Sequence, residues 1–151
     1  MSPPVLDVAV LAEALRARLA GQFVGGSAPF VPDSIGAPGK VRIDSDGAAH
    51  PYAVVWGDAA SSYGSALCAT PTEYVWQPTI TAAGGDPARC LRAVAAIRAA
   101  VLDWTPAIPG WSAGPMRELD TYFPGAPQID DTVQPQRAYL PLIFITDLTP
   151  A

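Results

Sequence analysis

The chain contains very little of the side-chain chemistry on which common enzymes depend. It has one histidine and two cysteines among its 151 residues. A zinc site is not expected, because such a site needs several His or Cys ligands. A nucleophilic triad would have to use His50, and no Gly-x-Ser-x-Gly segment accompanies it. We therefore expect no catalytic residue, no bound metal and no cofactor.

Long apolar runs and positive charge are also scarce. No apolar run approaches the roughly 20 residues that span a bilayer, and the N-terminus lacks a basic region followed by an apolar segment. The net charge is −5 and the pI is near 4.6, which disfavours electrostatic binding to nucleic-acid phosphates. These observations predict a soluble protein that is made in a cytoplasm and has no membrane partner.

The two cysteines, Cys68 and Cys90, allow one disulfide at most. Cys68 lies in a segment rich in Ser, Ala and Gly, and Cys90 lies on the apolar face of a predicted helix. Small, buried or half-buried thiols explain both positions more simply than a disulfide does.

The strongest local signal covers residues 73–103, where a strand, a two-glycine turn and a helix follow one another. Apolar residues alternate through 73–81, as in a half-buried strand. Pro78 cannot donate to a ladder, which predicts a sheet edge or a bulge there. Asp86 is placed to cap the following helix, 88–102, with Pro87 at its first position. The predicted buried face of that helix consists of Cys90, Val94, Ile97 and Val101, widened by Leu91 and Leu102.

The remaining segments complete an α+β pattern. A second amphipathic helix is predicted over Val5–Leu19, with Val8, Leu11, Leu15 and Leu19 along one apolar stripe and Gly21 as its stop. Strands are predicted at 40–44, 51–57, 115–123 and 138–146, with a turn at Asp46-Gly47 and an edge or bulge at Pro141. The last of these is almost continuously apolar, which suggests cover on both faces. Loops rich in Pro, Gly or polar residues are expected at 21–39, 58–72, 103–114 and 123–137.

This element order predicts a single domain over residues 1–151. We expect an antiparallel-rich mixed sheet of four to five strands, with two helices packed on one face and long loops between the elements. No internal repeat and no domain boundary is evident.

Few motifs suggest ligand binding. Gly36–Lys40 resembles a phosphate loop but lacks its spacing and does not open a helix. Gly84-Gly85 precedes a helix and could hold an anion, but Asp86 puts a negative charge there. The pairs Asp130-Asp131 and Glu118/Asp120 could coordinate Mg²⁺ or Ca²⁺. Adjacent acidic residues in a polar loop or on one strand face are more often solvated charges, and we favour that interpretation.

The tryptophans leave two interpretations open. Trp104 and Trp111 flank a Pro/Gly loop, and Trp56 ends a predicted strand. Tryptophans in such positions anchor a core, and loop aromatics also serve as anchors of protein interfaces.

The order of these segments resembles the tail terminator (tail completion) proteins of long-tailed bacteriophages, especially those of actinobacteria. The resemblance rests on the N-terminal Leu/Ala/Arg helix, on Pro51-Tyr-Ala-Val-Val-Trp56, and on Thr79-Ile-Thr-Ala-Ala-Gly84 leading into the helix that ends at Asp103-Trp104. Gly114-Pro115 before a strand and an aromatic strand near the C-terminus complete it. It is a pattern of elements through most of the chain and contains no catalytic signature.

The resemblance implies a structural role in the virion tail, at the neck. Proteins of this family form a ring, usually of six subunits, which caps the head-proximal end of the tail tube, stops its polymerisation and joins the tail to the head. The implied partners are further copies of the chain, the major tail tube protein and a head-completion or stopper protein, with DNA only as cargo passing through the lumen. Assembly would take place in the host cytoplasm.

Contact regions can be proposed for such a ring, in which each interface joins two different patches. We expect contacts from the loops 58–72 and 123–137 and from the loop that bears two tryptophans. The candidate residues for contact between subunits or with the tube are Tyr63, Trp104, Trp111, Phe123, Asp130 and Asp131.

Two alternatives remain from the sequence. The chain could be another neck component, a head-completion or stopper protein that binds portal or adaptor rings. It could also be a small enzyme that uses the carboxylates Glu118, Asp120, Asp130 and Asp131 in a pocket between sheet and helices.

Overall fold

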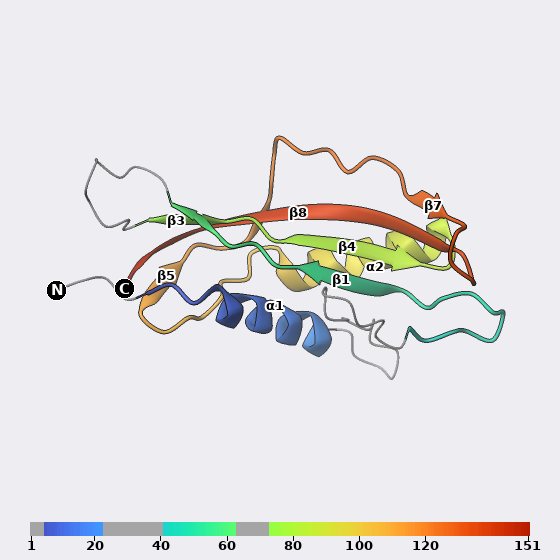
Figure 1. Cartoon of the computed structure of the whole chain (residues 1–151), viewed down its shortest axis with the longest axis horizontal. Coiled ribbons are helices and arrows are strands. Elements are labelled where there is room, and N and C mark those ends of the chain that lie inside the picture. The colour runs from blue at the N-terminus through green and yellow to red at the C-terminus, as the bar shows by residue number, and fades with distance from the viewer. Residues whose placement is uncertain (1–4, 23–40, 63–72) are drawn as a thin grey trace.

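One long strand organises the structure. In the computed structural model, which describes residues 5–22, 41–62 and 73–151, β8 (Arg137–Pro150) pairs with five other strands. β4 (Thr79–Gly84) and β3 (Tyr74–Trp76) lie along one edge of β8, and β7 (Gln128–Asp130), β6 (Arg117–Glu118) and β5 (Trp111–Ala113) lie along the other. β1 (Tyr52–Trp56) pairs with β4, and β2 (Ser61–Ser62) pairs with β3. Figure 1 shows β8 running the length of the molecule.

The predicted fold class is confirmed. Two helices, α1 (Val8–Gln22) and α2 (Pro87–Val101), accompany an eight-stranded sheet whose ladders are all antiparallel among the described residues. α2 packs on β4 and β8, and α1 packs on α2. Their buried side chains join those of the sheet in one core, which includes Leu11, Leu15 and Leu19 of α1. Neither helix in the described part of the chain has the length and apolarity needed to cross a membrane.

The sheet has eight strands instead of the four to five that we expected, and some of them lie outside the predicted strand segments. The segment 115–123 contributes only β6, and the described part of 40–44 forms only an isolated bridge between Ile43 and Ala49. β5 and β7 lie in segments expected to be loops. These strands have two or three residues each, too short to show a period of two. They form because β8 offers 14 residues of backbone to pair with.

The central strand is covered unequally on its two faces. Its residues alternate between buried and half-buried positions, with Leu140, Leu142 and Phe144 on the buried side. The near-continuous apolar sequence predicts cover on both faces of β8, and this prediction is wrong for one of them. The core covers one face, whereas the face that carries Ile143 and Ile145 stays half-exposed.

Pro78 lies inside the sheet, where the sequence predicted an edge or a bulge. The register against β8 continues through it, because Trp76 faces Thr146 and Thr79 faces Ile143. The amide of Phe144 donates to the Pro78 carbonyl at 3.1 Å, and the proline ring nitrogen cannot return that bond. The ladder is therefore interrupted between β3 and β4 without a shift in register.

The irregularity lies in the neighbouring strand instead. Between β1 and β2, the four residues 57–60 stand opposite the three residues 76–78. The Asp58 Oδ2 atom accepts the backbone amides of Gln77 at 3.0 Å and Ala60 at 3.1 Å. The carboxylate thus takes the place of a strand partner where the backbone bulges away.

Pro141 lies in β8 at a position where no described strand pairs with one edge of β8. It lies in the gap between β7 and β6, so a proline there costs no ladder bond on that side. The Tyr122 hydroxyl donates to the Pro141 carbonyl at 2.9 Å, and the Leu119 amide donates to the Ile143 carbonyl at 3.0 Å. The loop after β6 therefore supplies hydrogen-bond donors to the carbonyl groups of β8 that no described strand pairs with here.

The helix ends agree with the sequence signals in part. Asp86 caps α2 by accepting the Arg89 amide at 2.8 Å, with proline at the first helical position. α1 begins after Asp7, whose carboxylate accepts the Ala9 amide at 3.0 Å, and it continues to Gln22 past the expected stop at Gly21. Leu91 and Leu102 were expected on the buried face of α2, but both are exposed.

Candidate interaction surface

His50 belongs to a charged cluster that joins a tight hairpin to the start of α2. The hairpin covers residues 42–50 and is closed by backbone bonds between Arg42 and His50 and between Asp44 and Ala48. The Arg89 side chain donates to Asp44 at 3.0 Å, to Asp46 at 2.8 Å and to Asp86. The His50 ring lies 3.0 Å from Asp44. One guanidinium thus collects three carboxylates, which ties the hairpin to the helix.

The pKa directions in this cluster follow from those bonds. Partial burial alone would raise the pKa of Asp44, but hydrogen bonds with His50 and Arg89 lower it. The Arg89 side chain and the Ala48 amide lower the pKa of Asp46. The Arg89 amide and then its side chain lower the pKa of Asp86. All three carboxylates are therefore held ionised, as a structural ion-pair network requires and a general acid does not.

Gly84 and Gly85 lie where the hairpin and α2 pack closely against the turn between β4 and α2. A Cβ on Gly85 would lie 2.5 Å from the Ala49 nitrogen, and a Cβ on Gly84 would lie 2.6 Å from the Arg89 Cβ. The Gly85 amide donates to the Ala49 carbonyl at 2.8 Å. The two glycines therefore allow the hairpin backbone to approach the turn before α2. The phosphate-loop-like segment Gly36–Lys40 lies outside the described residues.

The four candidate carboxylates do not converge. Glu118 forms a two-point ion pair with Arg98 of α2, whose second bond measures 3.1 Å. Asp120 and Asp131 are exposed. Asp130 accepts the Thr132 hydroxyl and amide, which lower its pKa. Within residues 5–22, 41–62 and 73–151, no group of three His, Cys, Asp or Glu side chains is arranged to hold a metal ion.

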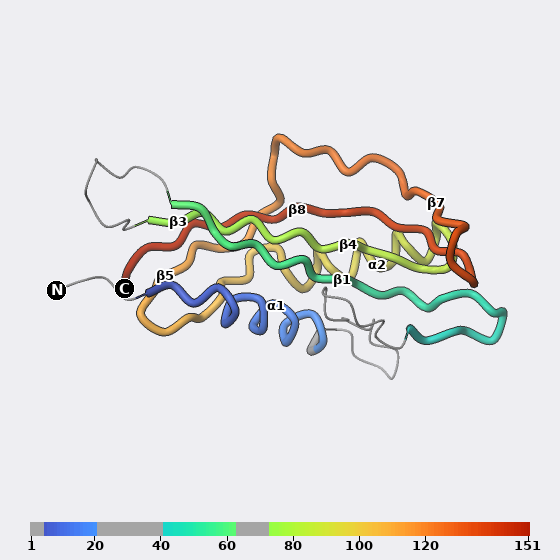
Figure 2. Tube along the Cα trace, viewed as in Figure 1, coloured from blue at the N-terminus to red at the C-terminus, as the bar shows by residue number. Residues whose placement is uncertain are grey.

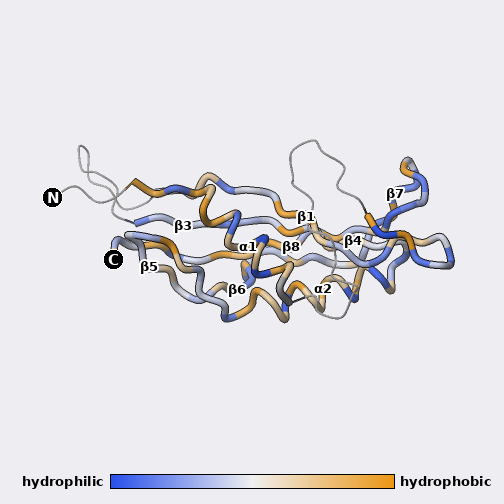
Figure 3. Tube along the Cα trace, turned by 90° about the horizontal axis from the view of Figure 1, so that it is seen from below, coloured by the Kyte–Doolittle hydropathy of each residue, from blue (hydrophilic) through white to orange (hydrophobic). Residues whose placement is uncertain are grey.

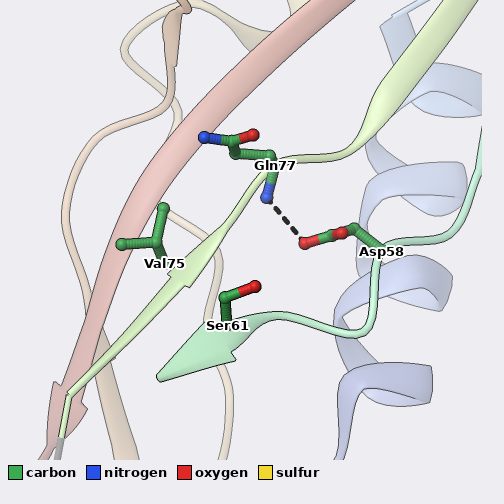
Figure 4. Close-up of a pocket in the computed structure, with 4 residues that line it drawn as sticks. All are labelled: Asp58, Ser61, Val75 and Gln77. Atoms are coloured by element: carbon green, nitrogen blue, oxygen red, sulfur yellow. Dashed lines mark hydrogen bonds between the residues drawn. The ribbon is translucent and has the colours of Figure 1, made fainter. Parts of the chain in front are cut away.

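A shallow pocket of about 340 Å³ lies over the bulge between β1 and β2. It is lined by Asp58, Ser61, Val75 and Gln77, and Figure 4 shows Asp58 turned toward the Gln77 backbone. Its single carboxylate is already occupied by two backbone amides. Ser61 and Gln77 are the other polar residues of its lining.

The aromatic candidates separate into core and surface residues. Trp111 is buried, and its ring meets that of Tyr74 edge to face, with centroids 5.4 Å apart. Trp104 is partly buried and packs against the core. Tyr63, like most of the loop 58–72, lies outside the described residues. Trp56 is 49% exposed at the end of β1. The core interpretation of the tryptophans therefore fits Trp111, whereas Trp56 offers its ring to solvent.

The most exposed aromatic side chain among the described residues lies on a loop that hydrogen bonds hold to β8. Residues 119–136, which we call the arm, leave the sheet after β6, pass beside β8 and return through β7 (Figure 1). Phe123, on the arm, is 86% exposed, and Ile129 is 49% exposed. Tyr122 holds the arm to β8 through the Pro141 carbonyl, and Tyr139 donates to Gln128 at 3.2 Å. The arm is thus held by hydrogen bonds while it presents apolar side chains to solvent.

A second apolar surface covers the sheet face opposite the helices, which we call the open sheet face. The cross-strand rows place Trp56, Thr79 and Ile143 side by side, and Val54, Thr81 and Pro141 in the next row. The Trp56 ring nitrogen donates to the Thr81 hydroxyl at 3.0 Å, which ties the ring to the neighbouring strand. Figure 3 shows apolar and polar residues mixed along these strands. This face therefore combines half-exposed apolar side chains with threonines.

The sequence identified only part of these surfaces. Phe123, Asp130 and Asp131 lie on the arm, as the predicted loop 123–137 implied. Ile129 and Val133 were missed because single apolar residues in a polar loop carry no periodic signal. Trp56 was considered among the tryptophans, but its exposure depends on which face of β1 meets the core. Figure 2 shows how far apart in the chain the contributing segments lie.

The fold and these surfaces define an antiparallel α+β protein with exposed apolar side chains on its arm and its open sheet face. No protein-family model matches the chain, and no curated protein matches its sequence.

Proposed function

We propose that this protein is a tail terminator of a long-tailed bacteriophage, a structural protein that forms a ring on the head-proximal end of the tail tube. The ring ends tube polymerisation and joins the tail to the head through a neck protein. The proposal starts from the resemblance of the sequence to this family.

One structural observation carries the proposal furthest: hydrogen bonds hold the arm to β8, yet the arm leaves the ring of Phe123 86% exposed. A large aromatic side chain on a hydrogen-bonded loop is a typical anchor for a second protein. The open sheet face gives the same chain a second, different apolar surface. Several unlike patches on one subunit let it meet both a neighbouring subunit, through a heterologous contact, and the end of the tube.

The charge distribution is compatible with this role. The chain has a net charge of −5, so a ring would repel DNA in its lumen and let it pass. The carboxylates weighed for an enzyme are either exposed or paired, with Glu118 held by Arg98. These positions favour the structural function over the carboxylate enzyme.

The test uses the full chain together with its expected partner. We expect mass photometry to show a discrete oligomer, negative-stain images to show annuli, and added protein to cap and shorten polymerising tail tubes. The variant Phe123→Ser should fold normally but neither form the oligomer nor cap tail tubes. A chain that stays monomeric and neither binds nor shortens tubes would sink the proposal. Binding to portal or adaptor rings instead of tubes would point to the other neck component.

A further inference from the structure

The exposed side of α2 is apolar where a solvent-facing helix is usually polar. Leu91 is 51% exposed and Leu102 is also exposed. The other exposed positions on this side are Ala88, Arg92, Ala95 and Ala99. Arg98 also lies on this side, but it pairs with Glu118. Arg92 is exposed and forms no ion pair or hydrogen bond within the part of the chain that the structure describes.

The β7 end of the arm combines exposed apolar side chains with a negative charge, and so complements the exposed side of α2. Ile129 and Val133 are exposed apolar side chains, and between them Asp131 is exposed without a partner among the described residues. Each patch therefore combines apolar side chains with one unpaired charge, and the two charges are of opposite sign. Apolar contact around a complementary charge pair is typical of a specific interface.

The two patches lie at the same end of the molecule but on different sides. Ala138 of β8 faces Ile129 of β7 on one edge and Gly84, just before α2, on the other. Figure 1 and Figure 3 show β7 and the first turns of α2 together at one end of the long axis. Neighbours in a cyclic ring meet at equal height along the ring axis. A ring axis along the long axis of the subunit would thus bring the β7 end of one copy to α2 of the next.

We infer that the β7 end of the arm, with Ile129, Asp131 and Val133, docks on the exposed side of α2, at Leu91 and Arg92, of a neighbouring copy of this chain. The inference rests on the proposed ring and names its subunit contact. Asp131 of one copy then pairs with Arg92 of the next, while Ile129 and Val133 cover Leu91. The occupant is a second copy because the two patches, on one chain, complement each other in both charge and apolarity.

Charge reversal tests the contact directly. Asp131→Arg alone and Arg92→Asp alone each place like charges opposite one another, so each should weaken self-association by at least about tenfold. An equal mixture of the D131R and R92D chains makes every such contact complementary in an alternating ring. We expect the mixture to assemble within about threefold of the unmodified protein, because contacts with the original charge pair alternate with contacts that carry the reversed pair. Assembly is measured by mass photometry in solution and on tail-tube ends.

The controls separate this contact from folding and from other contacts. Both positions are exposed, so each variant should keep the circular dichroism spectrum of the unmodified chain. Asp120→Arg, an exposed acid at the opposite end of the arm, should not change assembly. Unweakened single variants, or a mixture that fails to assemble, overturn the inference.

Other results would distinguish a wrong subunit contact from a wrong proposed function. Single variants that lose tube binding but keep self-association would make the tube protein the occupant of the arm, which also overturns the inference. If the unmodified chain forms rings and caps tubes while the charge reversals have no effect, only this contact is wrong. If the unmodified chain neither self-associates nor binds tubes, the proposed function fails with it.

Discussion

The Arg89 side chain donates from Nε to the Asp44 carboxylate at 3.0 Å, across 45 positions of the chain. The same guanidinium also bonds Asp46 and Asp86. The first turn of α2 and the hairpin 42–50 are therefore one unit, and the loss of a single side chain should separate them.

We expect Arg89→Met to lower the Tm at neutral pH and to make stability less dependent on acid. The pKa values of Asp44 and Asp46 are lowered, so their contribution is present above the unfolded value of about 4 and is lost as the pH falls through the folded values. Removing the guanidinium should flatten the Tm profile below about pH 4. Arg117→Met, which removes an exposed arginine outside this cluster, is the control and should leave the profile unchanged. An unaltered profile in R89M would show that the cluster contributes nothing to stability.

Gly85→Ala should destabilise the fold through a backbone clash. The new Cβ would meet the Ala49 nitrogen at 2.5 Å, and overpacking of this kind typically costs about 1–3 kcal/mol. Gly57→Ala is the matched control, because nothing lies within 4 Å of a Cβ there. Urea unfolding of both variants measures the difference. Equal stabilities would mean that the hairpin can move away from the turn without cost.

Tyr122→Phe should loosen the arm with little effect on the core. The change removes the hydroxyl that donates to the Pro141 carbonyl, a bond worth about 0.5–1.5 kcal/mol. Hydrogen exchange should rise in residues 119–136 and stay constant in β4. Tyr139→Phe, whose hydroxyl donates to Gln128 in an exposed position, should change exchange much less. Similar exchange in both variants would mean that the Pro141 bond does not hold the arm.

Phe123 and Trp111 should behave in opposite ways. Phe123→Ser removes an exposed ring, so unfolding free energy should stay within about 0.5 kcal/mol of the unmodified value. Trp111→Ala empties a buried site and should cost about 3–5 kcal/mol. Chemical denaturation measures both. A strongly destabilised F123S would mean that the ring packs within its own chain.

Cys90 should resist alkylation in the native protein. It lies in the core, and burial raises the pKa of its thiol to about 11. Little thiolate is present at pH 8, and the reagent cannot reach the sulfur. Peptide mass spectrometry after iodoacetamide treatment should find Cys90 modified only in denatured protein. Rapid native labelling would show that α2 detaches from β4.

Much of the core could be predicted from local patterns. α2 follows from its Asp86 cap, its leading proline and its apolar period, and all of these signals lie within the helix itself. β1, β4 and β8 follow from alternation or apolarity over five or more residues. Such segments are readable because the period of a helix or strand is repeated several times within them.

The tertiary structure alone decided the rest. β5, β6 and β7 are too short to carry a pattern and exist because β8 is long enough to pair with all of them. The sequence of α2 does not reveal that Leu91 and Leu102 face outward, because their burial depends on where the sheet and α1 end. The surfaces on which the proposed function depends are likewise decided by packing, since an apolar side chain is exposed only when no other element covers it.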